Sequence, residues 1–241
     1  MKKILLILTL LAFVAGVGYY LLAERGGAQI TSVDYPVVGV DVSAHNGPAL
    51  DFDTLRSEGV EFALIKATEG VSLKDSRFHS NYLKARRAGL KVGAYHFFRF
   101  DCTGMMQALN LMHSVRGKEL DLPLIIDVEE WSNPVTHPTP GVLGSLHEML
   151  DYLDSHGYPV MIYTNKNGYE RFVKGRLESY PLWLCSLSEL DGKTDCHIWQ
   201  FSHNGRLKGA PGPIDLNAFT GTREQWEEWL DSVNRIAPPA Q

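Results

Sequence analysis

The chain has 241 residues, of which 44% are hydrophobic and 21% charged, and this composition is that of a folded protein with a substantial apolar core. The formal net charge is −5 and the basic residues are scattered, which argues against a nucleic-acid-binding protein. The length allows one large domain or two small ones, and α/β barrels often reach this size as a single unit.

The N-terminal segment departs from this globular composition. Lys2 and Lys3 are followed by residues 4–22, a run of 19 residues without a charged side chain. A secretory signal usually has an apolar region of about 7–15 residues, whereas crossing a bilayer takes about 20. We therefore expect residues 1–24 to form an uncleaved signal anchor, a transmembrane helix; a cleaved signal peptide is the alternative. The two lysines would stay in the cytoplasm, which makes the rest of the chain extracytoplasmic, in the periplasm.

The remaining chain divides into three parts. Residues 25–36 include Gly26 and Gly27 and are expected to be a tether, residues 37–236 a single catalytic barrel, and residues 237–241 a short tail.

Three cysteines would lie in that oxidising compartment, Cys102, Cys185 and Cys196. An odd number leaves at least one of them unpaired within the chain. Cys185 and Cys196 flank a polar loop and could form a disulfide, with free buried thiols as the alternative. We expect no metal at these residues, because neither Cys-x-x-Cys nor paired histidine spacing accompanies them.

Short apolar segments alternate with amphipathic segments from residue 37 to residue 177. The alternation predicts five strand–helix pairs, at residues 37–40 and 52–58, 62–66 and 78–88, 91–98 and 105–115, 124–128 and 142–156, and 160–163 and 168–177. Strands that alternate with helices form parallel sheets through right-handed crossovers.

After residue 177 the helices become rare. Three further strands are predicted at residues 182–185, 197–201 and 214–216, followed by a closing helix at 223–236. Eight parallel-type strands can close into a barrel, whereas an open doubly wound sheet would carry helices throughout. No Gly-x-Gly-x-x-Gly motif follows a strand, which excludes a dinucleotide-binding fold. We therefore predict an irregular TIM-like α/β barrel, (β/α)5(β)3.

The apolar segment before residue 127 ends in two carboxylates. Side chains two residues apart on a strand point to the same face, so Asp127 and Glu129 should project together from the strand's tip. Two carboxylates in one low-dielectric site cannot both ionise freely, and one should keep its proton near neutral pH. Glycoside cleavage requires such an acid beside a base. A strand that simply ends in solvated acidic residues is the alternative.

The other predicted strand ends also carry polar or aromatic residues. They include Asp41, Lys66 to Glu69, His96, Tyr163 to Asn165, Trp183, Gln200 and Asp215. In a closed barrel, functional groups gather at the carboxyl ends of the strands. Closure also brings the eighth strand beside the first, so Asp41 and Asp215 should be neighbours. Each position has an ordinary alternative: Asp41 could cap a helix, His96 could be a satisfied core histidine, and Trp183 could be ordinary packing.

Seven motifs in the same order resemble those of the family 25 glycoside hydrolases, the Chalaropsis-type lysozymes. They lie at residues 39–43, 62–70, 93–98, 123–129, 162–165, 181–183, and 198–202 leading to 212–217. The resemblance implies an irregular barrel that hydrolyses the β-1,4 bond between N-acetylmuramic acid and N-acetylglucosamine in peptidoglycan. It implies no metal and no cofactor.

The resemblance also implies roles for individual residues. Glu129 matches the general acid, Asp127 its partner, and Asp41 and Asp215 two further acidic residues of the site. The residues at positions near the substrate are Tyr163, Trp183, Gln200 and His96. We expect a retaining-type hydrolysis in which Glu129 acts as acid and then as base. Asp127 would support attack by the substrate's own 2-acetamido group; direct attack by Asp127 and an inverting route are the alternatives.

One segment departs from the family pattern. The family often has an alanine and, two residues later, a tyrosine where this chain has Cys185, Ser186 and Leu187. An aromatic contact to the glycan would therefore be missing.

Two rival functions share parts of this pattern. A chitinase-like barrel also carries acidic residues at a strand end, but it has an Asp where this chain has Ile125. A non-catalytic peptidoglycan-binding barrel would not need all four carboxylates. We expect the glycan strand of peptidoglycan as the partner, the inner membrane as the anchor, no nucleic acid, and a monomer.

Overall fold

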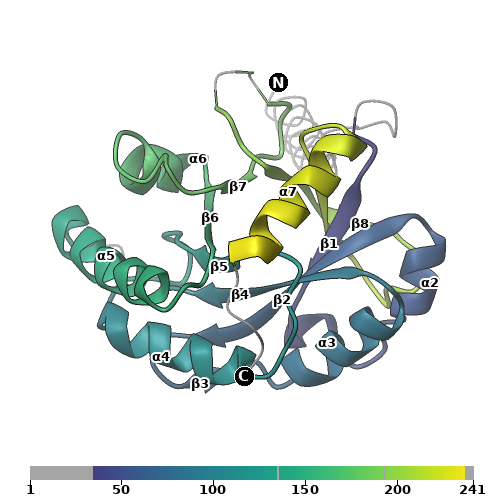
Figure 1. Ribbon diagram of the computed structural model, residues 1–241, viewed down its shortest axis with the longest axis horizontal. Helices are drawn as coiled ribbons and strands as arrows, with labels where there is room; N and C mark the ends of the chain where they lie inside the picture. The colour runs from purple at the N-terminus through teal and green to yellow at the C-terminus, as the bar shows by residue number, and fades with distance from the viewer. Residues whose placement is uncertain (1–34, 135, 191, 193, 237–241) are drawn as a thin grey trace, which may run out of the picture.

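The computed structural model describes residues 35–134, 136–190, 192 and 194–236, which form a closed barrel of strands with helices outside it (Figure 1). Within these residues, eight strands close the barrel in the order β1-β9-β8-β7-β6-β5-β4-β2, and β2 pairs with β1. The short β3 only extends the sheet beside β2. The predicted α/β barrel is confirmed.

The strands are β1 (Val38–Val42), β2 (Val60–Glu69), β3 (Leu73–Lys74), β4 (Lys91–Phe97), β5 (Leu124–Asp127), β6 (Val160–Asn165), β7 (Leu182–Cys185), β8 (Ile198–Gly205) and β9 (Ile214–Phe219). The helices are the 3-10 turn η1 (Ala44–Asn46), α2 (Phe52–Ser57), α3 (Phe78–Arg87), α4 (Gly104–Val115), α5 (Thr139–Ser155), α6 (Lys166–Gly168), the π-helical turn η2 (Tyr169–Val173) and α7 (Arg223–Ile236). The helix predicted at 168–177 is therefore wrong in form, since only two short helical turns occur there.

The direction of β9 differs from the prediction of parallel-type strands. β9 runs antiparallel to both β8 and β1, whereas the other neighbouring strands of the barrel are parallel. The connection between β8 and β9, residues 206–213, contains no helix, and a short connection without a crossover can only reverse the chain. The beginning of β9 therefore lies at the same end of the barrel as the carboxyl ends of the other strands.

Alternation along the strands separates two apolar layers. In β5, Leu124 and Ile126 face the helices and belong to the outer cluster, while Ile125 faces the barrel axis. The inner cluster consists of Val37, Phe62, Leu64, Leu122, Ile125, Met161, Tyr163, Trp183, Cys185, Ile198, Phe219, Trp226 and Leu230. Full burial of one large apolar side chain stabilises a fold by about 1.5–3 kcal/mol, so the filled barrel is a rigid platform.

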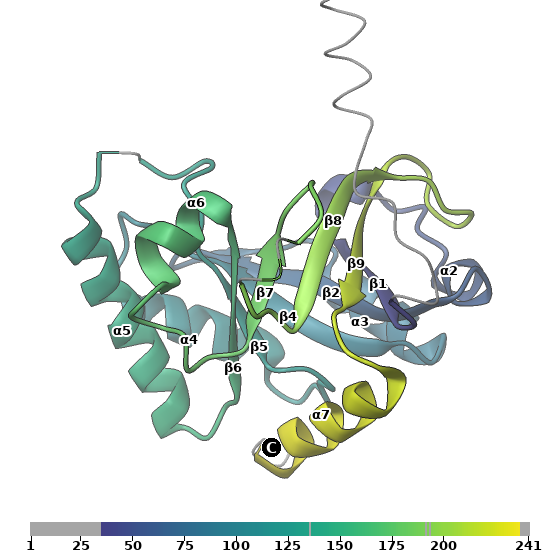
Figure 2. The same cartoon turned by 90° about the horizontal axis from the view of Figure 1, so that it is seen from above.

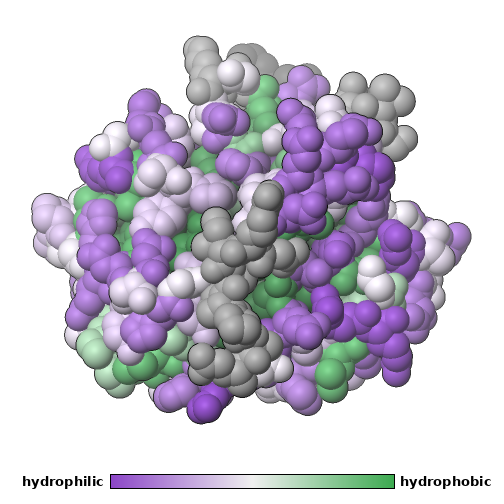
Figure 3. All heavy atoms as spheres, viewed as in Figure 1, coloured by the Kyte–Doolittle hydropathy of each residue, from purple (hydrophilic) through white to green (hydrophobic). Residues whose placement is uncertain are grey.

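Helix α7 closes the amino-terminal end of the barrel (Figures 1 and 2). Its Trp226 ring lies 5.2 Å from the rings of both Phe62 and Phe219, and Leu230 also joins the inner cluster. The outward side of α7 is hydrophilic in Figure 3, as expected for an amphipathic helix that covers a core. Because α7 covers the amino-terminal end, a substrate has access at the carboxyl end.

All three cysteines are free thiols. Cys185 belongs to the inner cluster and Cys196 to the outer cluster, so their side chains lie on opposite faces of the sheet and cannot meet. The structure therefore has the free-thiol alternative at this pair.

Within the described ranges, no helix combines the length and the apolar character needed to cross a bilayer. The transmembrane helix predicted at residues 1–24, most of the tether at 25–36, and the tail at 237–241 lie outside those ranges.

Candidate active site

The carboxyl end of the barrel carries four acidic residues, Asp41, Asp127, Glu129 and Asp215, and we call this end the mouth. Asp41 on β1 and Asp215 on β9 are register partners, as expected from barrel closure. Asp127 ends β5, and Glu129 follows it by two residues, close enough for its charge to raise the pKa of Asp127. The charges of Asp41 and Glu129 both act on Asp127, and the charge of Asp215 acts on Asp41, so the four acidic residues influence one another's pKa values.

Asp41 is buried and is held by two amide groups. Its Oδ2 accepts hydrogen bonds from Gln200 Nε2 at 2.7 Å and from Asn217 Nδ2 at 2.8 Å. Burial raises the pKa of Asp41 to about 8, the charge of Asp215 adds to the rise, and the two amide donors oppose it. Asp41 therefore holds a proton at neutral pH, and the mouth carries less negative charge than its four acidic residues suggest.

Asp127 is more deeply buried than its neighbour Glu129. Asp127 is 6% exposed, and its Oδ1 accepts no hydrogen bond from the residues that the structure describes. Burial raises the pKa of Asp127 well above its usual range, the charge of Glu129 adds to the rise, and Lys66 opposes it. Burial also raises the pKa of the half-buried Glu129, against the hydrogen bond donated by Asn165 Nδ2 to Oε2 at 3.4 Å. Both shifts favour one proton shared by the pair near neutral pH.

Three of the predicted substrate contacts lie beneath the carboxylates and support them. The Tyr163 hydroxyl donates to Gln200 Oε1 at 2.8 Å, and Gln200 in turn donates to Asp41. Trp183 Nε1 donates to Asn217 Oδ1 at 2.8 Å, and its ring lies 4.3 Å from that of Tyr163. Because Tyr163, Trp183 and Gln200 are all buried, this network fixes the position of Asp41.

His96 is not brought to the mouth. Its Nε2 lies 3.1 Å from Gln107 Oε1 on α4, and its Nδ1 lies 2.7 Å from Thr68 Oγ1. Burial lowers the pKa of His96 to about 4, so the ring is neutral, donating to Gln107 and accepting from Thr68. His96 thus belongs to the packing between β4 and α4, which corrects its expected place near the substrate. Side chains alternate along β4, so Tyr95 is the residue that faces the barrel interior.

Three mouth residues were not predicted as site residues. Lys66 was noted only as a strand end, although its charge lowers the pKa of both Asp127 and Glu129. Asn217 lies two residues after Asp215, so strand alternation could have found it. His203 gave no such signal, because register shifts on β8 between Gln200 and Gly205 break the alternation.

The loop after Glu129 exposes a large aromatic side chain. Trp131 is 71% exposed, two residues beyond Glu129. Asn133 anchors this loop, since its Nδ2 donates to the backbone oxygens of Phe98 and Glu129, each at 2.9 Å. The loop therefore presents the Trp131 ring to solvent beside the mouth, and an exposed indole suits stacking on sugar rings.

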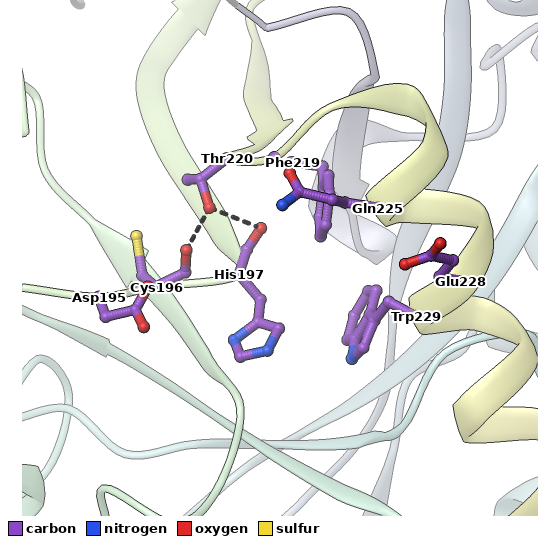
Figure 4. A pocket seen from close by; sticks show the side chains of 9 residues that line it. Asp195, Cys196, His197, Phe219, Thr220, Gln225, Glu228 and Trp229 are labelled. Atoms are coloured by element: carbon purple, nitrogen blue, oxygen red, sulfur yellow. Dashed lines mark hydrogen bonds between the residues drawn. The ribbon is translucent and has the colours of Figure 1, made fainter.

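A separate hollow of about 480 Å³ lies at the amino-terminal end of the barrel, between α7 and the strand ends of β8 and β9. His197 and Trp229 face each other there, with Glu228 on the helix side (Figure 4). The Thr220 hydroxyl donates to the backbone oxygen of Cys196 at its edge. Barrel enzymes place their chemistry at the opposite end, so we assign no catalytic role to this hollow.

Comparison with known proteins identifies the family. The profile of the family described as Glycosyl hydrolases family 25 matches residues 40–210. The chain belongs to glycosyl hydrolase family 25. A solved family 25 glycosyl hydrolase from Bacillus anthracis superposes with a TM-score of 0.74 at 32% identity, covering 85% of this chain and 97% of that one.

Two curated lysozymes are similar to this family 25 hydrolase. Lysozyme M1 of Streptomyces globisporus is 32% identical over an alignment of 206 positions, and this alignment covers 77% of this chain and 68% of that protein. The autolytic lysozyme of Clostridium acetobutylicum is 30% identical over 184 residues, 76% of this chain but only 55% of that lysozyme's length. The resemblance seen in the sequence motifs is confirmed, and this member of family 25 is a glycoside hydrolase of the lysozyme class. Among the described residues, no three His, Cys, Asp or Glu side chains are grouped to hold a metal ion.

Proposed function

We propose that the protein hydrolyses the β-1,4 bond between N-acetylmuramic acid and N-acetylglucosamine in peptidoglycan, with Glu129 as the general acid and base. The observation that carries this proposal is the pairing of half-buried Glu129 with buried Asp127, whose Oδ1 has no hydrogen-bond partner in the described part of the chain. The lysozyme relatives support peptidoglycan as the substrate.

Binding of the sugar would move the shared proton to the residue that needs it. Asp127 is the more buried member of the pair, so it competes strongly for the proton before the substrate binds. The N–H of the substrate's 2-acetamido group is a donor that suits the unpartnered Oδ1 of Asp127. Such a hydrogen bond favours the ionised form of Asp127, and the proton is then held by Glu129.

Glu129 would then donate this proton to the oxygen of the leaving sugar. The acetamido oxygen attacks the anomeric carbon on the opposite face, and ionised Asp127 stabilises the positive charge that develops on the acetamido group. In the second step Glu129 takes a proton from water as the water attacks the same carbon. The sugar keeps its anomeric configuration, because two displacements occur at that carbon. The family 25 resemblance and the raised pKa values of both carboxyls support these roles.

Asp41 and Asp215 would act by position and charge. Asp41 is held by Gln200 and Asn217 in the floor of the mouth, and Asp215 raises its pKa. We assign Asp41 and Asp215 to holding the substrate and tuning Asp127. Tyr163, Trp183 and Gln200 would position Asp41, and the exposed Trp131 would contact the glycan.

The location of the enzyme is also a proposal. Residues 37–236 would act as one monomeric catalytic barrel, held by a transmembrane anchor at residues 1–24 on the outer side of the inner membrane. The apolar run at residues 4–22 and the substrate of lysozymes, which lies outside the cytoplasm, support this arrangement.

Product analysis tests the reaction. Purified protein is incubated with peptidoglycan, and the new ends of the released fragments are identified by mass spectrometry after reduction. We expect N-acetylmuramic acid at the reducing ends. New N-acetylglucosamine reducing ends would contradict the proposed bond, and binding without any release would favour a non-catalytic glycan-binding barrel.

A further inference from the structure

A thiol, an imidazole and a carboxylate contact one another in sequence at the mouth. Cys185 Sγ lies 3.5 Å from His203 Nε2, and His203 Nδ1 lies 3.2 Å from Asp215 Oδ1. The imidazole therefore contacts a nucleophilic atom on one side and a carboxylate that orients it on the other. This is the arrangement that activates a cysteine as a nucleophile.

The thiol lies inside the mouth. Cys185 is the last residue of β7, belongs to the inner cluster and is 9% exposed, while the His203 side chain is 43% exposed. Charge on Cys185 acts on Asp127 and Tyr163, so the sulfur lies close to the proposed catalytic pair. A second observation indicates that a ligand binds here. The buried Oδ1 of Asp127 lacks a hydrogen-bond partner among the described residues, and a bound ligand could supply one.

His203 places a protonated imidazole beside the Cys185 sulfur. Hydrogen bonds with Asp215 and Cys185 raise the pKa of His203 to about 10, and burial opposes this rise. An imidazolium beside a thiol stabilises the thiolate, which is the reactive form of cysteine.

The other two cysteines have the opposite surroundings. Cys196 lies in the outer cluster, and burial raises its pKa to about 12. Burial also raises the pKa of Cys102, and its Sγ lies 3.8 Å from Asp101 Oδ1, a carboxylate that disfavours a neighbouring thiolate. Cys102 and Cys196 are therefore internal references for the reactivity of Cys185.

We propose that Cys185 is a reactive thiol in the mouth, that small disulfides modify it reversibly, and that the modified enzyme cannot bind its glycan. The Cys185 thiolate attacks one sulfur of the small disulfide while its former proton remains on His203. A new S–S bond forms to Cys185, the S–S bond of the reagent breaks, and the departing thiolate takes the bonding electrons. Only the consequence for glycan binding rests on the proposed function.

The adduct would occupy the position that the substrate needs. The group attached to Cys185 would project beside Asp127, and it would also disturb the contact of His203 with Asp215. A thiol in excess would reverse the reaction by the same exchange. The family often has alanine at this position, so we expect hydrolysis itself to be independent of the sulfur.

The labelling rate of each cysteine tests the reactive thiol. The full-length protein is treated with 4,4′-dithiodipyridine, a neutral disulfide that the acidic mouth does not repel, and each cysteine is followed by peptide mass spectrometry. We expect Cys185 to react at least about tenfold faster than Cys102 and Cys196 at neutral pH. His203→Gln should slow Cys185 by at least about tenfold and leave Cys102 unchanged. The matched control His79→Gln removes an exposed histidine on α3 and should change neither rate. Equal rates for Cys185 and Cys102 in the wild-type protein would overturn the proposal.

A second measurement tests the blocked mouth. Labelling of Cys185 should abolish peptidoglycan hydrolysis, and dithiothreitol should restore it. Cys185→Ala, or Cys185→Ser if the alanine variant folds poorly, should hydrolyse peptidoglycan and resist the reagent. Full hydrolysis by the labelled wild-type protein would contradict the blocked mouth. The labelling rates are measured by mass spectrometry and do not depend on enzymatic activity. If the unlabelled protein fails to hydrolyse peptidoglycan, the proposed function is wrong, and the labelling rates still test whether Cys185 is a reactive thiol.

Discussion

Asp41 on β1 and Asp215 on β9 face each other across the antiparallel strand pair that closes the barrel. Directly opposite side chains on such a pair have Cβ atoms about 4.5–5.5 Å apart. At this separation the charge of Asp215 disfavours the ionisation of Asp41. Asp41 is the buried member and keeps its proton near neutral pH, since its pKa is raised to about 8. Barrel closure therefore sets the charge of the mouth as well as its shape.

Glu129→Gln should abolish hydrolysis and leave glycan binding intact. Glutamine has nearly the shape of glutamic acid but cannot donate the proton that the leaving oxygen needs, and loss of a general acid costs about 10²–10⁴ in rate. Release of reducing ends from peptidoglycan measures kcat. Glu130→Gln is the matched control, because Glu130 pairs with Arg171, and it should keep most of the activity. Near wild-type turnover by Glu129→Gln would assign the acid to another carboxylate of the mouth.

Asp127→Asn should be nearly as severe for a different reason. The variant lacks the charge that stabilises the cation formed from the acetamido group, a loss of at least about 10² in kcat. It also removes a negative neighbour of Glu129, so Glu129 gives up its proton at lower pH. The pH–rate profile of the variant's residual activity should therefore have its basic limb at lower pH than the wild-type profile. A basic limb that stays in place would argue against electrostatic pairing of the two carboxyls.

Asp41→Asn should flatten the loss of stability between pH 3.8 and about pH 8. The pKa of Asp41 is about 8 in the folded protein against 3.8 for the ordinary residue, so the folded state binds this proton more tightly. The resulting stabilisation is complete below pH 3.8 and is lost as pH rises through about 8, at up to about 1.4 kcal/mol per pH unit. Asparagine can still accept from Gln200 and Asn217 and does not titrate. The free energy of unfolding, measured with urea across this pH range, should fall less steeply for the variant than for the wild type. Parallel plots of this free energy against pH for the two proteins would contradict the raised pKa.

Asp41→Asn should also reduce activity less than Glu129→Gln or Asp127→Asn. Its role is to orient the site and tune its field, and the two amide contacts to residue 41 survive in the variant. The same peptidoglycan assay checks this order, and inactivity equal to that of Glu129→Gln would give Asp41 a direct chemical role.

His96→Ala should lower stability and leave the KM for glycan unchanged. The substitution removes the partner of Thr68 and Gln107, both buried, at a cost of about 2–4 kcal/mol. The pKa of His96 is lowered to about 4 from 6.5, so its contribution is present above pH 6.5 and is lost as pH falls through about 4. Urea unfolding measures this, with His79→Ala on α3 as an exposed control within about 0.5 kcal/mol of wild type. A raised KM with unchanged stability would contradict this structural role and support the substrate contact that the family resemblance implies for His96.

Trp131→Ala should raise KM several-fold with little change in kcat or stability. The indole is 71% exposed, so the folded state loses little when it is removed, while a stacked sugar loses its platform. Leu83→Ala on α3 is a matched control, because it also removes an exposed large apolar side chain. Unchanged KM for soluble glycan fragments would exclude Trp131 from the binding surface.

The sequence by itself determined the barrel, because its signals are local. Each buried strand is a short apolar run, and the amphipathic segments between the first strands predict crossovers. Strand alternation alone also predicts that Asp127 and Glu129 lie close together, and in the structure the charge of Glu129 acts on Asp127. The pairing of Asp41 with Asp215 needed only the further assumption that the barrel closes.

Only the tertiary structure decided which side chains the mouth contains. His96 lies at a predicted strand end, yet it faces α4, because the register of β4 turns Tyr95 inward. His203 turns toward Cys185 and Asp215 after shifts in the β8 register that no sequence period shows. Likewise, Cys185 at the end of β7 faces the inner cluster, whereas Cys196, just before β8, packs in the outer cluster. Such contacts depend on long-range register and on burial, and burial also sets the pKa values of the carboxyls, so local patterns cannot specify them.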